Sequence, residues 1–188
     1  MKKLTTQEMN RMSPEAFHEA PKVPLIAVLD NVRSQHNIGA VFRTADAFRL
    51  QGVWLCGICC CPPNDEIHKT ALGAENTVDW QYFTNTLDAV HALHDAGFTV
   101  YAVEQAHDST TLEDIKISNL QSPMSNCPKI AVIFGHEVFG VQQSVVDACD
   151  GCIEIPQYGT KHSLNVSVTA GIVLYELSNL LRNIISRT

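Results

Sequence analysis

Residues 155–167 read IPQYGTKHSLNVS and join a short apolar stretch to a long apolar helix. Polar side chains between a buried strand and a helix occupy the usual ligand position of an α/β sheet. Ser163 or Asn165 is also a suitable helix N-cap, because either side chain can accept a backbone N–H. Capping needs only one of them, so a Ser and an Asn two positions apart after a loop indicate a binding or catalytic site.

The bulk composition predicts one globular domain located in the cytoplasm. The chain has 188 residues, of which 45% are hydrophobic and 18% charged, which is enough for a single domain with a real core. No apolar run reaches the roughly 18 residues that a membrane span needs, and residues 1–20 lack the apolar region of a secretory signal. The formal net charge of −7 argues against broad, sequence-independent binding of nucleic acid but permits a local basic patch.

Strand-like and helix-like segments alternate along the chain. Residues 25–29 and 130–134 are continuous apolar runs, which is the pattern of strands buried on both faces of a sheet. This alternation predicts an α/β fold with a mostly parallel sheet and helices on both faces. The polar segment 105–128 is expected to be a flexible loop. Further strands are expected at 52–56, 78–83, 98–103 and 152–155, and helices at 37–48, 65–71, 87–96, 141–148 and 165–185.

The first 22 residues are expected to form a helical extension ahead of a main domain that covers residues 23–188. Thr5 and Glu8 have the spacing of a capping box, and Ser13-Pro14 fits an N-cap followed by the first helical position. Two short helices are therefore predicted. Lys2, Lys3 and Arg11 give this otherwise acidic chain a basic end.

Seven cysteines make an odd count, and two pairs have CxxC spacing, Cys56/Cys59 and Cys149/Cys152. Two such pairs can hold zinc. Their wide separation is unlike the compact spacing of a zinc ribbon. We therefore expect no metal site, and free reduced thiols that pack as small hydrophobic side chains.

Two further polar segments follow predicted buried strands. Segment 31–45 carries Asn37, a candidate helix cap, and Gly39, which permits close approach of another chain or a ligand. Arg43 lies near the same helix face as Asn37, just under two turns further on. Spacing alone leaves a surface salt bridge as an equal alternative for this arginine.

The other segment, 134–140, reads FGHEVFG. Its glycines resemble a P-loop spacing, but Val141-Gln142 stands where a P-loop needs Lys-Ser/Thr, and the chain contains no GxGxxG. Phosphate cradling and dinucleotide binding are therefore poor interpretations. Glu137 is either a first-turn helix charge or a site residue. Because the three segments follow parallel strands, we expect them to cluster at one edge of the sheet.

Together the three segments resemble the motifs of the SpoU/TrmH family of RNA ribose 2′-O-methyltransferases. They read NxGxxxRxA at 37–45, GxExxG at 135–140, and IP followed by SLNVS at 155–167. The motifs occur in order, and the resemblance covers residues 25–186. The ALGA stretch at 71–74 also resembles the family's Gly-Ala segment, whereas Gln157 stands where the family commonly has Met.

The resemblance implies a fold and a cofactor. It makes residues 23–188 a methyltransferase domain whose parallel sheet is tied in a C-terminal trefoil knot, a rare topology that pattern alone does not predict. S-adenosylmethionine would lie in the knot, held largely by backbone groups. Carried over by position, the cofactor-binding residues are Gly135, Ile155, Leu164, Gln157, Val103 and Glu104.

The implied reaction is methyl transfer to a ribose 2′-hydroxyl. It requires alignment of the methyl group with the oxygen, loss of the hydroxyl proton and a hold on the neighbouring phosphate. Arg43 matches the family's catalytic arginine, and clamping a phosphate is its easier role, since a guanidinium stays protonated at neutral pH. The other implied catalytic residues, which would orient the hydroxyl and Arg43, are Asn37, Glu137, Ser163 and Asn165.

The resemblance further implies a homodimer, with Arg43 and the C-terminal helix near the partner, and an RNA substrate. Transfer RNA is the first expectation, with ribosomal RNA left open. The apolar positions of 165–185 cover more than one helix stripe, which is wider than packing on one sheet needs. These positions are Val166, Ile172, Val173, Leu177, Leu180, Leu181, Ile184 and Ile185.

Three other functions stay open on the sequence. One is a catalytically inactive knotted protein that binds RNA or assists assembly, although the intact polar set argues against it. The second is a zinc or thiol-redox protein built on the cysteines. The third is a methyltransferase that acts on an RNA base.

Overall fold

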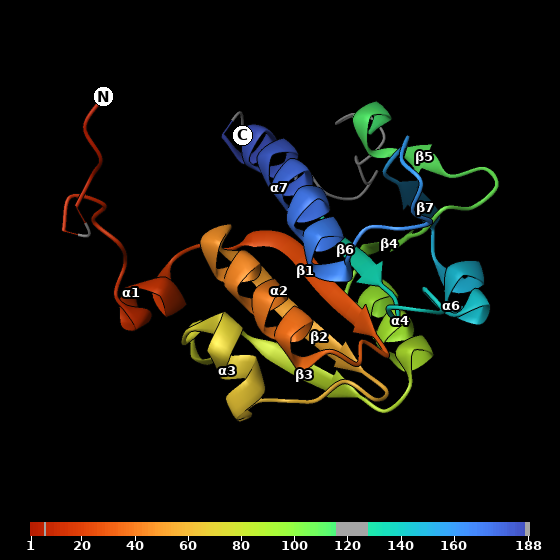
Figure 1. Cartoon of the computed structure of the whole chain (residues 1–188), viewed down its shortest axis with the longest axis horizontal. Helices are drawn as coiled ribbons and strands as arrows, with labels where there is room; N and C mark the ends of the chain where they lie inside the picture. Colours follow the sequence, from red (N-terminus) through yellow and green to blue (C-terminus); the bar gives the residue numbers. More distant parts are fainter. Residues whose placement is uncertain (6, 116–127, 187–188) are drawn as a thin grey trace.

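The computed structural model describes residues 1–5, 7–115 and 128–186 of the chain. Within these residues seven strands form one sheet in the order β3-β2-β1-β6-β4-β7-β5, and all neighbouring strands are parallel (Figure 1). The predicted α/β fold with a parallel sheet is therefore confirmed. The strands are β1 (Val23–Asp30), β2 (Leu50–Cys56), β3 (Trp80–Phe83), β4 (Thr99–Val103), β5 (Thr110–Thr111), β6 (Ile130–Phe134) and β7 (Gly151–Glu154).

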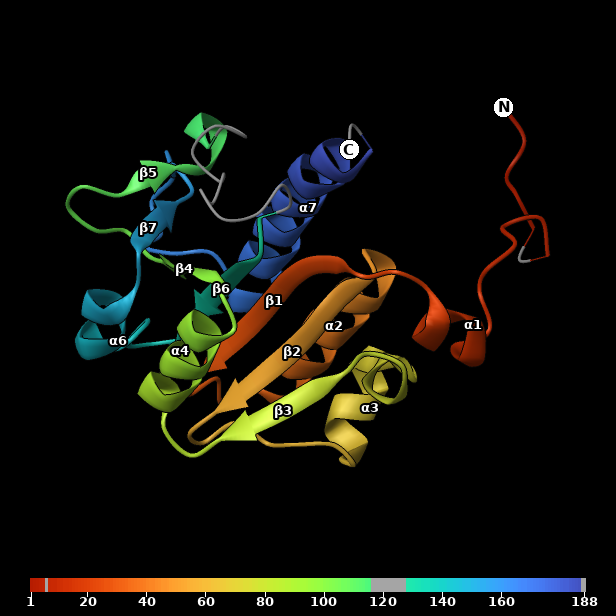
Figure 2. The ribbon, with the colours of Figure 1, turned by 180° about the vertical axis from the view of Figure 1, so that it is seen from behind.

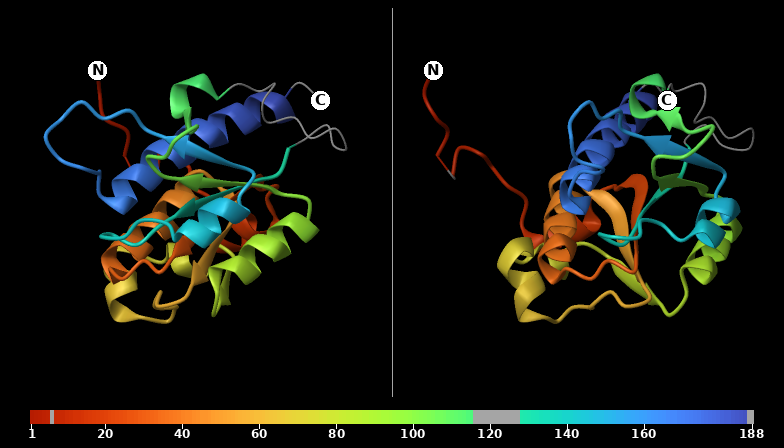
Figure 3. Two further views of the ribbon diagram at one scale, coloured as in Figure 1. Left: turned by 90° about the vertical axis from the view of Figure 1, so that its right-hand side faces the viewer. Right: turned by 45° about the vertical axis from the view of Figure 1, so that its right-hand side comes forward.

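Helices cover both faces of the sheet, as predicted. In β1, Leu25 packs into the core under α2 and α7, whereas its neighbour Ile26 packs into a second core with α4. The right-hand view of Figure 3 shows α2 and α7 on one side of the strands and α4 and α6 on the other. The helices are α1 (Pro14–Glu19), α2 (Gln35–Ala47), α3 (Asp65–Ala71), α4 (Thr86–Asp95), α6 (Gln143–Ala148) and α7 (Val166–Ile185).

The helix caps decide which polar side chains remain available to a site. Ser34, and not Asn37, caps α2, because its side chain accepts the backbone N–H of Asn37 at 3.3 Å. The prediction that Asn37 is a cap is therefore wrong, and its amide is free to reach other segments. At α7 the cap is Asn165, which accepts the N–H groups of Ser167 and Val168.

Gly39 is required where α2 packs against α3. A Cβ atom at this position would lie 2.2 Å from Oγ1 of Thr70 and 2.3 Å from the carbonyl oxygen of Ile67. No side chain fits in that space. The close approach predicted at Gly39 is thus made by another helix of the same chain.

The segment 105–128 contains regular structure that its polar composition did not predict. Residues 110–111 form β5 beside β7, and a 3₁₀ turn η2 (Leu112–Asp114) follows. Leu112 and Ile115 are buried in the core, and their burial fixes this part of the segment. The flexible-loop prediction is wrong for these residues, and its part at 116–127 lies outside the described residues.

The N-terminal extension contains one of the two predicted helices. Thr5 and Glu8 make the reciprocal hydrogen bonds of a capping box, but residues 7–9 form a turn and not a helix. A helix this short gains too little from its own backbone bonds to persist without packing. The second helix, α1, forms as predicted with Ser13 as its cap, and Phe17 packs into the core. Figure 2 shows the chain ahead of α1 leading away from the sheet.

The cysteines of the described part of the chain are free thiols. Burial raises the pKa of Cys56, Cys59 and Cys149 to about 12. These thiols therefore stay protonated and pack as small apolar groups. No group of three or more metal-ligating side chains occurs among the described residues. No helix within the described residues has the length and apolar character to cross a membrane.

Candidate active site

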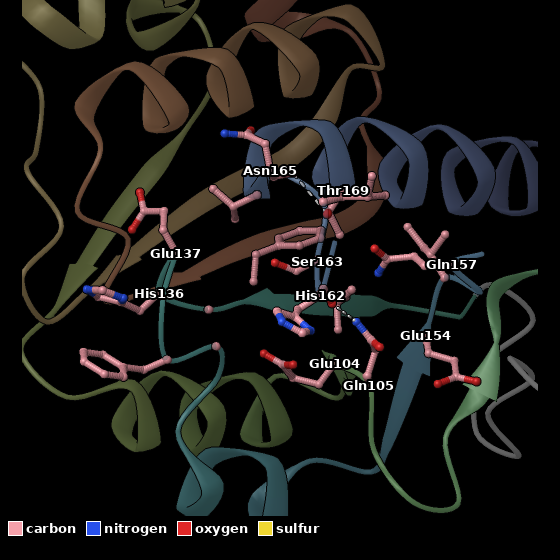
Figure 4. Close-up of a pocket in the computed structure, with 18 of the residues that line it drawn as sticks. Glu104, Gln105, His136, Glu137, Glu154, Gln157, His162, Ser163, Asn165 and Thr169 are labelled. Carbon is pink, nitrogen blue, oxygen red and sulfur yellow. Dashed lines mark hydrogen bonds between the residues drawn. The ribbon is translucent and has the colours of Figure 1, made fainter. Parts of the chain in front are cut away.

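A cavity of about 540 Å³ lies at the carboxyl ends of β4, β6 and β7, beside the start of α7 (Figure 4). This volume is in the range of small-molecule pockets. Over the described residues its lining carries Glu104, Glu137 and Glu154 but no lysine or arginine. Such a lining favours a ligand with positive charge and disfavours a polyphosphate.

Glu137 ties the second motif segment to the first. Its carboxylate accepts the backbone N–H groups of Arg33 at 3.0 Å and Ser34 at 2.8 Å, and Nδ2 of Asn37 at 3.2 Å. Burial alone would raise the pKa of Glu137, but these hydrogen bonds outweigh it and hold the pKa below its ordinary value. The carboxylate is therefore ionised at neutral pH and fixes the loop between β1 and α2.

Asn37 in turn connects to the third segment. Oδ1 of Asn37 accepts a hydrogen bond from Nδ2 of Asn165 at 3.2 Å. Glu137, Asn37 and Asn165 thus form one hydrogen-bonded row, with one residue from each motif segment. Figure 4 places Glu137 and Asn165 along the same side of the cavity. The predicted clustering of the three segments at one sheet edge is confirmed by these contacts.

Two glycines allow the second segment to fold back on itself beside the cavity. A Cβ atom on Gly135 would lie 2.0 Å from the carbonyl carbon of Gly140, and Gly140 has a φ of +68°. Glu104, at the end of β4, fastens this fold by accepting the N–H of Val141 at 2.7 Å. The backbone of the segment is thereby held at the wall of the cavity.

Asp30 is a buried charged residue that sequence reasoning missed. It ends β1 and is fully buried. Its carboxylate accepts a hydrogen bond of 2.5 Å from Oγ1 of Thr86. It also accepts two hydrogen bonds from Gln142, one of 3.0 Å from the backbone N–H and one of 3.1 Å from Nε2. Asp30 and Glu104 therefore hold the N–H groups of two consecutive residues, Val141 and Gln142. A charged residue directly after a continuous apolar run was the available sequence signal.

The structure brings most of the predicted site residues to this cavity but leaves Arg43 outside it. Asn37 lies beside the cavity through its hydrogen bonds to Glu137 and Asn165. Arg43 is exposed on α2, and its side chain has no ion pair or hydrogen bond with the described residues, so the salt-bridge alternative gains no support. The predicted residues that line the cavity are Val103, Glu104, Gly135, Glu137, Ile155, Gln157, Ser163, Leu164 and Asn165.

The lining also contains residues that were not predicted as site residues, among them His136, Phe139 and His162. His136 and Phe139 occupy unspecified positions of the GxExxG pattern, so comparison with the motif passes over them. His162 precedes the SLNVS stretch, and its carbonyl oxygen accepts Nε2 of Gln105 at 2.7 Å. Only the folded loops bring these residues to one wall.

Comparison with known proteins identifies the family. Residues 24–175 match the SpoU rRNA Methylase family. The 23S rRNA (guanosine-2′-O-)-methyltransferase RlmB of Vibrio parahaemolyticus is 34% identical over 161 residues, which is 86% of this chain and 60% of that protein. A putative TrmH family tRNA/rRNA methyltransferase of Staphylococcus aureus is 33% identical over 152 residues, with coverages of 81% and 57%. The chain therefore spans less than two thirds of the length of these curated relatives.

Solved structures have the same fold. The TrmH/SpoU tRNA modifying enzyme of A. aeolicus superposes with a TM-score of 0.74 at 25% identity, over 90% of this chain and 81% of that one. An AdoMet-bound rRNA methyltransferase from Sinorhizobium meliloti also gives 0.74 at 25% identity, over 87% and 62%. The trefoil knot stays a prediction from the family. Because the family match spans well over half of the residues, the chain belongs to the SpoU rRNA Methylase family.

Proposed function

We propose that this protein transfers a methyl group from S-adenosylmethionine to a ribose 2′-hydroxyl in structured RNA. The observation that carries the proposal is the row Glu137–Asn37–Asn165. It sets polar side chains from all three motif segments beside one cofactor-sized cavity. The names of the relatives agree with this reaction, since RlmB is a guanosine-2′-O-methyltransferase.

The lining of the cavity fits S-adenosylmethionine. Its glutamates suit the sulfonium and ammonium charges of the cofactor, and its described part offers no lysine or arginine for a polyphosphate. Gly135 contributes backbone groups, while Ile155 and Leu164 contribute apolar surface. Val103, Glu104 and Gln157 complete the wall. When bound, the cofactor supplies the reactive methyl group.

Ser163 is the side chain most available to the substrate hydroxyl. The side-chain amides of Asn37 and Asn165 are already hydrogen-bonded to each other. That of Asn37 also donates to Glu137, and that of Asn165 accepts a backbone N–H as the cap of α7. Ser163, in contrast, is exposed at the cavity and has no hydrogen-bond partner within the described residues. In this mechanism Ser163 orients the ribose hydroxyl. The hydrogen-bonded row Glu137–Asn37–Asn165 holds the start of α7 next to the loop before α2.

We further propose that the protein acts as a homodimer in which Arg43 serves the cavity of the partner. The described lining of the chain's own cavity has no lysine or arginine for an RNA phosphate, whereas the side chain of Arg43 is exposed and has no partner among the described residues. An apolar groove of about 690 Å³ beside α7 includes Ile155, which also lines the cavity. A second copy seated on this groove would therefore border the active site. The outward face of α7 supports this, with Val168, Ile172 and Tyr175 between 40% and 54% exposed.

A charge in this groove should separate the subunits. Ile172→Asp is expected to weaken dimerisation by about 100-fold or more, because an unpaired carboxylate would be buried in an apolar contact. Methyl transfer should fall with it. Sedimentation at micromolar concentration measures the oligomeric state.

The control for this experiment is Ser144→Asp, which adds the same charge to an exposed position of α6 on the other face of the sheet. It should sediment like the wild type. A wild-type protein that sediments as a monomer at micromolar concentration would rule out the dimer.

The RNA is proposed to be transfer RNA, with ribosomal RNA as the alternative, and the protein would act in the cytoplasm. The test is mass spectrometry of nucleosides from transfer RNA and 23S rRNA of cells lacking this gene. Loss of one 2′-O-methylnucleoside is the expected result, and the RNA fraction that shows it identifies the substrate. Loss of a methylated base instead would refute ribose methylation. If no nucleoside changes and calorimetry detects no S-adenosylmethionine binding, the protein is an inactive RNA-binding relative.

The residues ahead of α1 should contribute to RNA affinity and not to cofactor affinity. Removing residues 1–12 deletes Lys2, Lys3 and Arg11 but keeps the buried Phe17. The RNA affinity should become less salt-dependent. The slope of the logarithm of the binding constant against the logarithm of the salt concentration should become shallower by roughly 0.7–0.9 for each lost phosphate contact. Salt titrations of RNA binding check this, and calorimetry should give an unchanged S-adenosylmethionine affinity. An unaltered RNA affinity would mean that the segment only covers the fold.

A further inference from the structure

We propose that Phe139, backed by His136, is a platform on which one unstacked RNA base lies at the mouth of the cavity. This proposal rests on the proposed function and adds the device by which the target nucleotide is positioned. The two residues lie inside the second motif segment, at positions that the motif leaves unspecified.

The platform is unusual in its exposure. Phe139 is 83% exposed and belongs to neither core cluster of the fold. Its ring lies against that of His136 in a tilted arrangement, with ring centroids 4.9 Å apart and planes inclined by 33°. An exposed phenyl ring contributes no hydrophobic burial to the free energy of folding. The ring is buried only when a ligand covers its face, so binding a ligand there is favourable.

The ring is held in place by a closed turn. His136 and Gly140 exchange backbone hydrogen bonds of 3.0 and 2.8 Å, and the N–H of Val138 donates to Nδ1 of His136 at 3.0 Å. Glu137, which lies between His136 and Val138, points towards the loop before α2, where its carboxylate accepts hydrogen bonds. The backbone of the turn is thus held by these hydrogen bonds, and the ring of Phe139 projects from it against His136.

An RNA base is the ligand that this position favours. His136 and Phe139 line the same cavity as Ser163, so a base on the ring would bring its ribose close to the proposed hydroxyl site. Protein recognition of RNA loops commonly uses bases that are splayed out and stacked on aromatic rings. Stacking needs no positive charge, which suits a chain with a formal net charge of −7 and no lysine or arginine in the described lining.

The test compares two substitutions that differ in their π-face. Phe139→Leu keeps apolar bulk and removes the ring, whereas Phe139→Trp keeps a ring. Filter binding without cofactor uses bulk transfer RNA and 23S rRNA as probes. For the RNA that binds the wild type, Phe139→Leu should lower the affinity roughly 5- to 150-fold, the equivalent of one base stack. Phe139→Trp should stay within about threefold of the wild type. In turnover, KM for RNA should rise in the Leu variant more than kcat falls.

Trp80→Leu is the matched control, because Trp80 is a partly exposed aromatic residue on the edge strand β3, outside the cavity. It should bind RNA like the wild type. Equal RNA affinity for Phe139→Leu and wild type would overturn the platform. If Phe139→Leu lost affinity for S-adenosylmethionine in calorimetry, the ring would be assigned to the cofactor and the platform would also be overturned. If Phe139→Leu sedimented as a monomer while the wild type did not, the ring would be assigned to the contact with a second copy. Because RNA binding is measured without methyl transfer, failure of the proposed reaction is a separate result.

Discussion

Arg43→Ala should abolish methyl transfer and leave S-adenosylmethionine binding nearly intact. Arg43 is exposed on α2 and does not line the cavity of its own chain, so its removal does not disturb the cofactor wall. Its fixed charge and paired donors suit an RNA phosphate. Removing one positioned charged donor typically costs on the order of 10²- to 10³-fold in rate. Single-turnover kinetics measure the loss, and calorimetry measures the cofactor affinity.

The Arg43→Lys variant separates a phosphate clamp from a proton acceptor. A clamp should keep part of its activity in the Lys variant, since a point charge retains some attraction to phosphate. A proton acceptor should instead gain activity steeply at high pH, because an amine loses its proton more readily than a guanidinium. A single-turnover pH profile of both variants decides between these roles.

Lys129→Ala is the control for general loss of positive charge. Lys129 is exposed just before β6, at the opposite edge of the sheet from the cavity. Its removal should leave turnover unchanged. Wild-type-like turnover by Arg43→Ala would show that Arg43 is an ordinary surface cation.

Replacing Glu137 by Gln should weaken both the fold and the site. The carboxylate accepts two backbone N–H groups and the amide of Asn37, and a Gln side chain would turn an NH₂ group towards one of these donors. Hydrogen bonds to a charged group each contribute roughly 1.5–3 kcal/mol, so we expect a loss of about 2 kcal/mol in the free energy of unfolding. Methyl transfer should fall further, because Asn37 and Asn165 lose their alignment. Denaturant unfolding and single-turnover rates measure the two effects.

The pH dependence of unfolding provides a direct check on Glu137. Its pKa is lowered in the folded protein, so its stabilisation is fully present above the ordinary value of about 4.3 and is lost as the pH falls through the lower folded value. The stability difference between wild type and Glu137→Gln should therefore be constant near neutral pH and vanish in acid. Glu19→Gln makes the same replacement at an exposed position of α1, and as the control it should unfold like the wild type at neutral pH. A difference that persists in strong acid would mean that size, and not charge, is what the site requires.

Local patterns predicted the elements of this protein well. The continuous apolar runs at 25–29 and 130–134 are strands because both faces of a parallel sheet are buried. α3 and β6 have the predicted bounds, and Asn165 caps α7 as one of two expected candidates. Most of the site residues that the motifs identified line the cavity, because residues after parallel strands meet at one sheet edge. The sequence also showed that α7 is apolar on more than one side. The structure shows which side is which, because Val173 and Leu181 face the core while Ile172 is 40% exposed.

The sequence by itself determined the α/β class, the placement of helices and strands and the three polar segments, because each depends on neighbouring residues and their period. Only the tertiary structure decided what those segments do to one another. Glu137 and Arg33 are 104 positions apart, and Asp30 and Gln142 are 112 apart. Such contacts form when strands pack side by side, and no local periodicity encodes them. For the same reason the exposed ring of Phe139 and the position of Arg43 outside its own cavity became visible only in the folded chain.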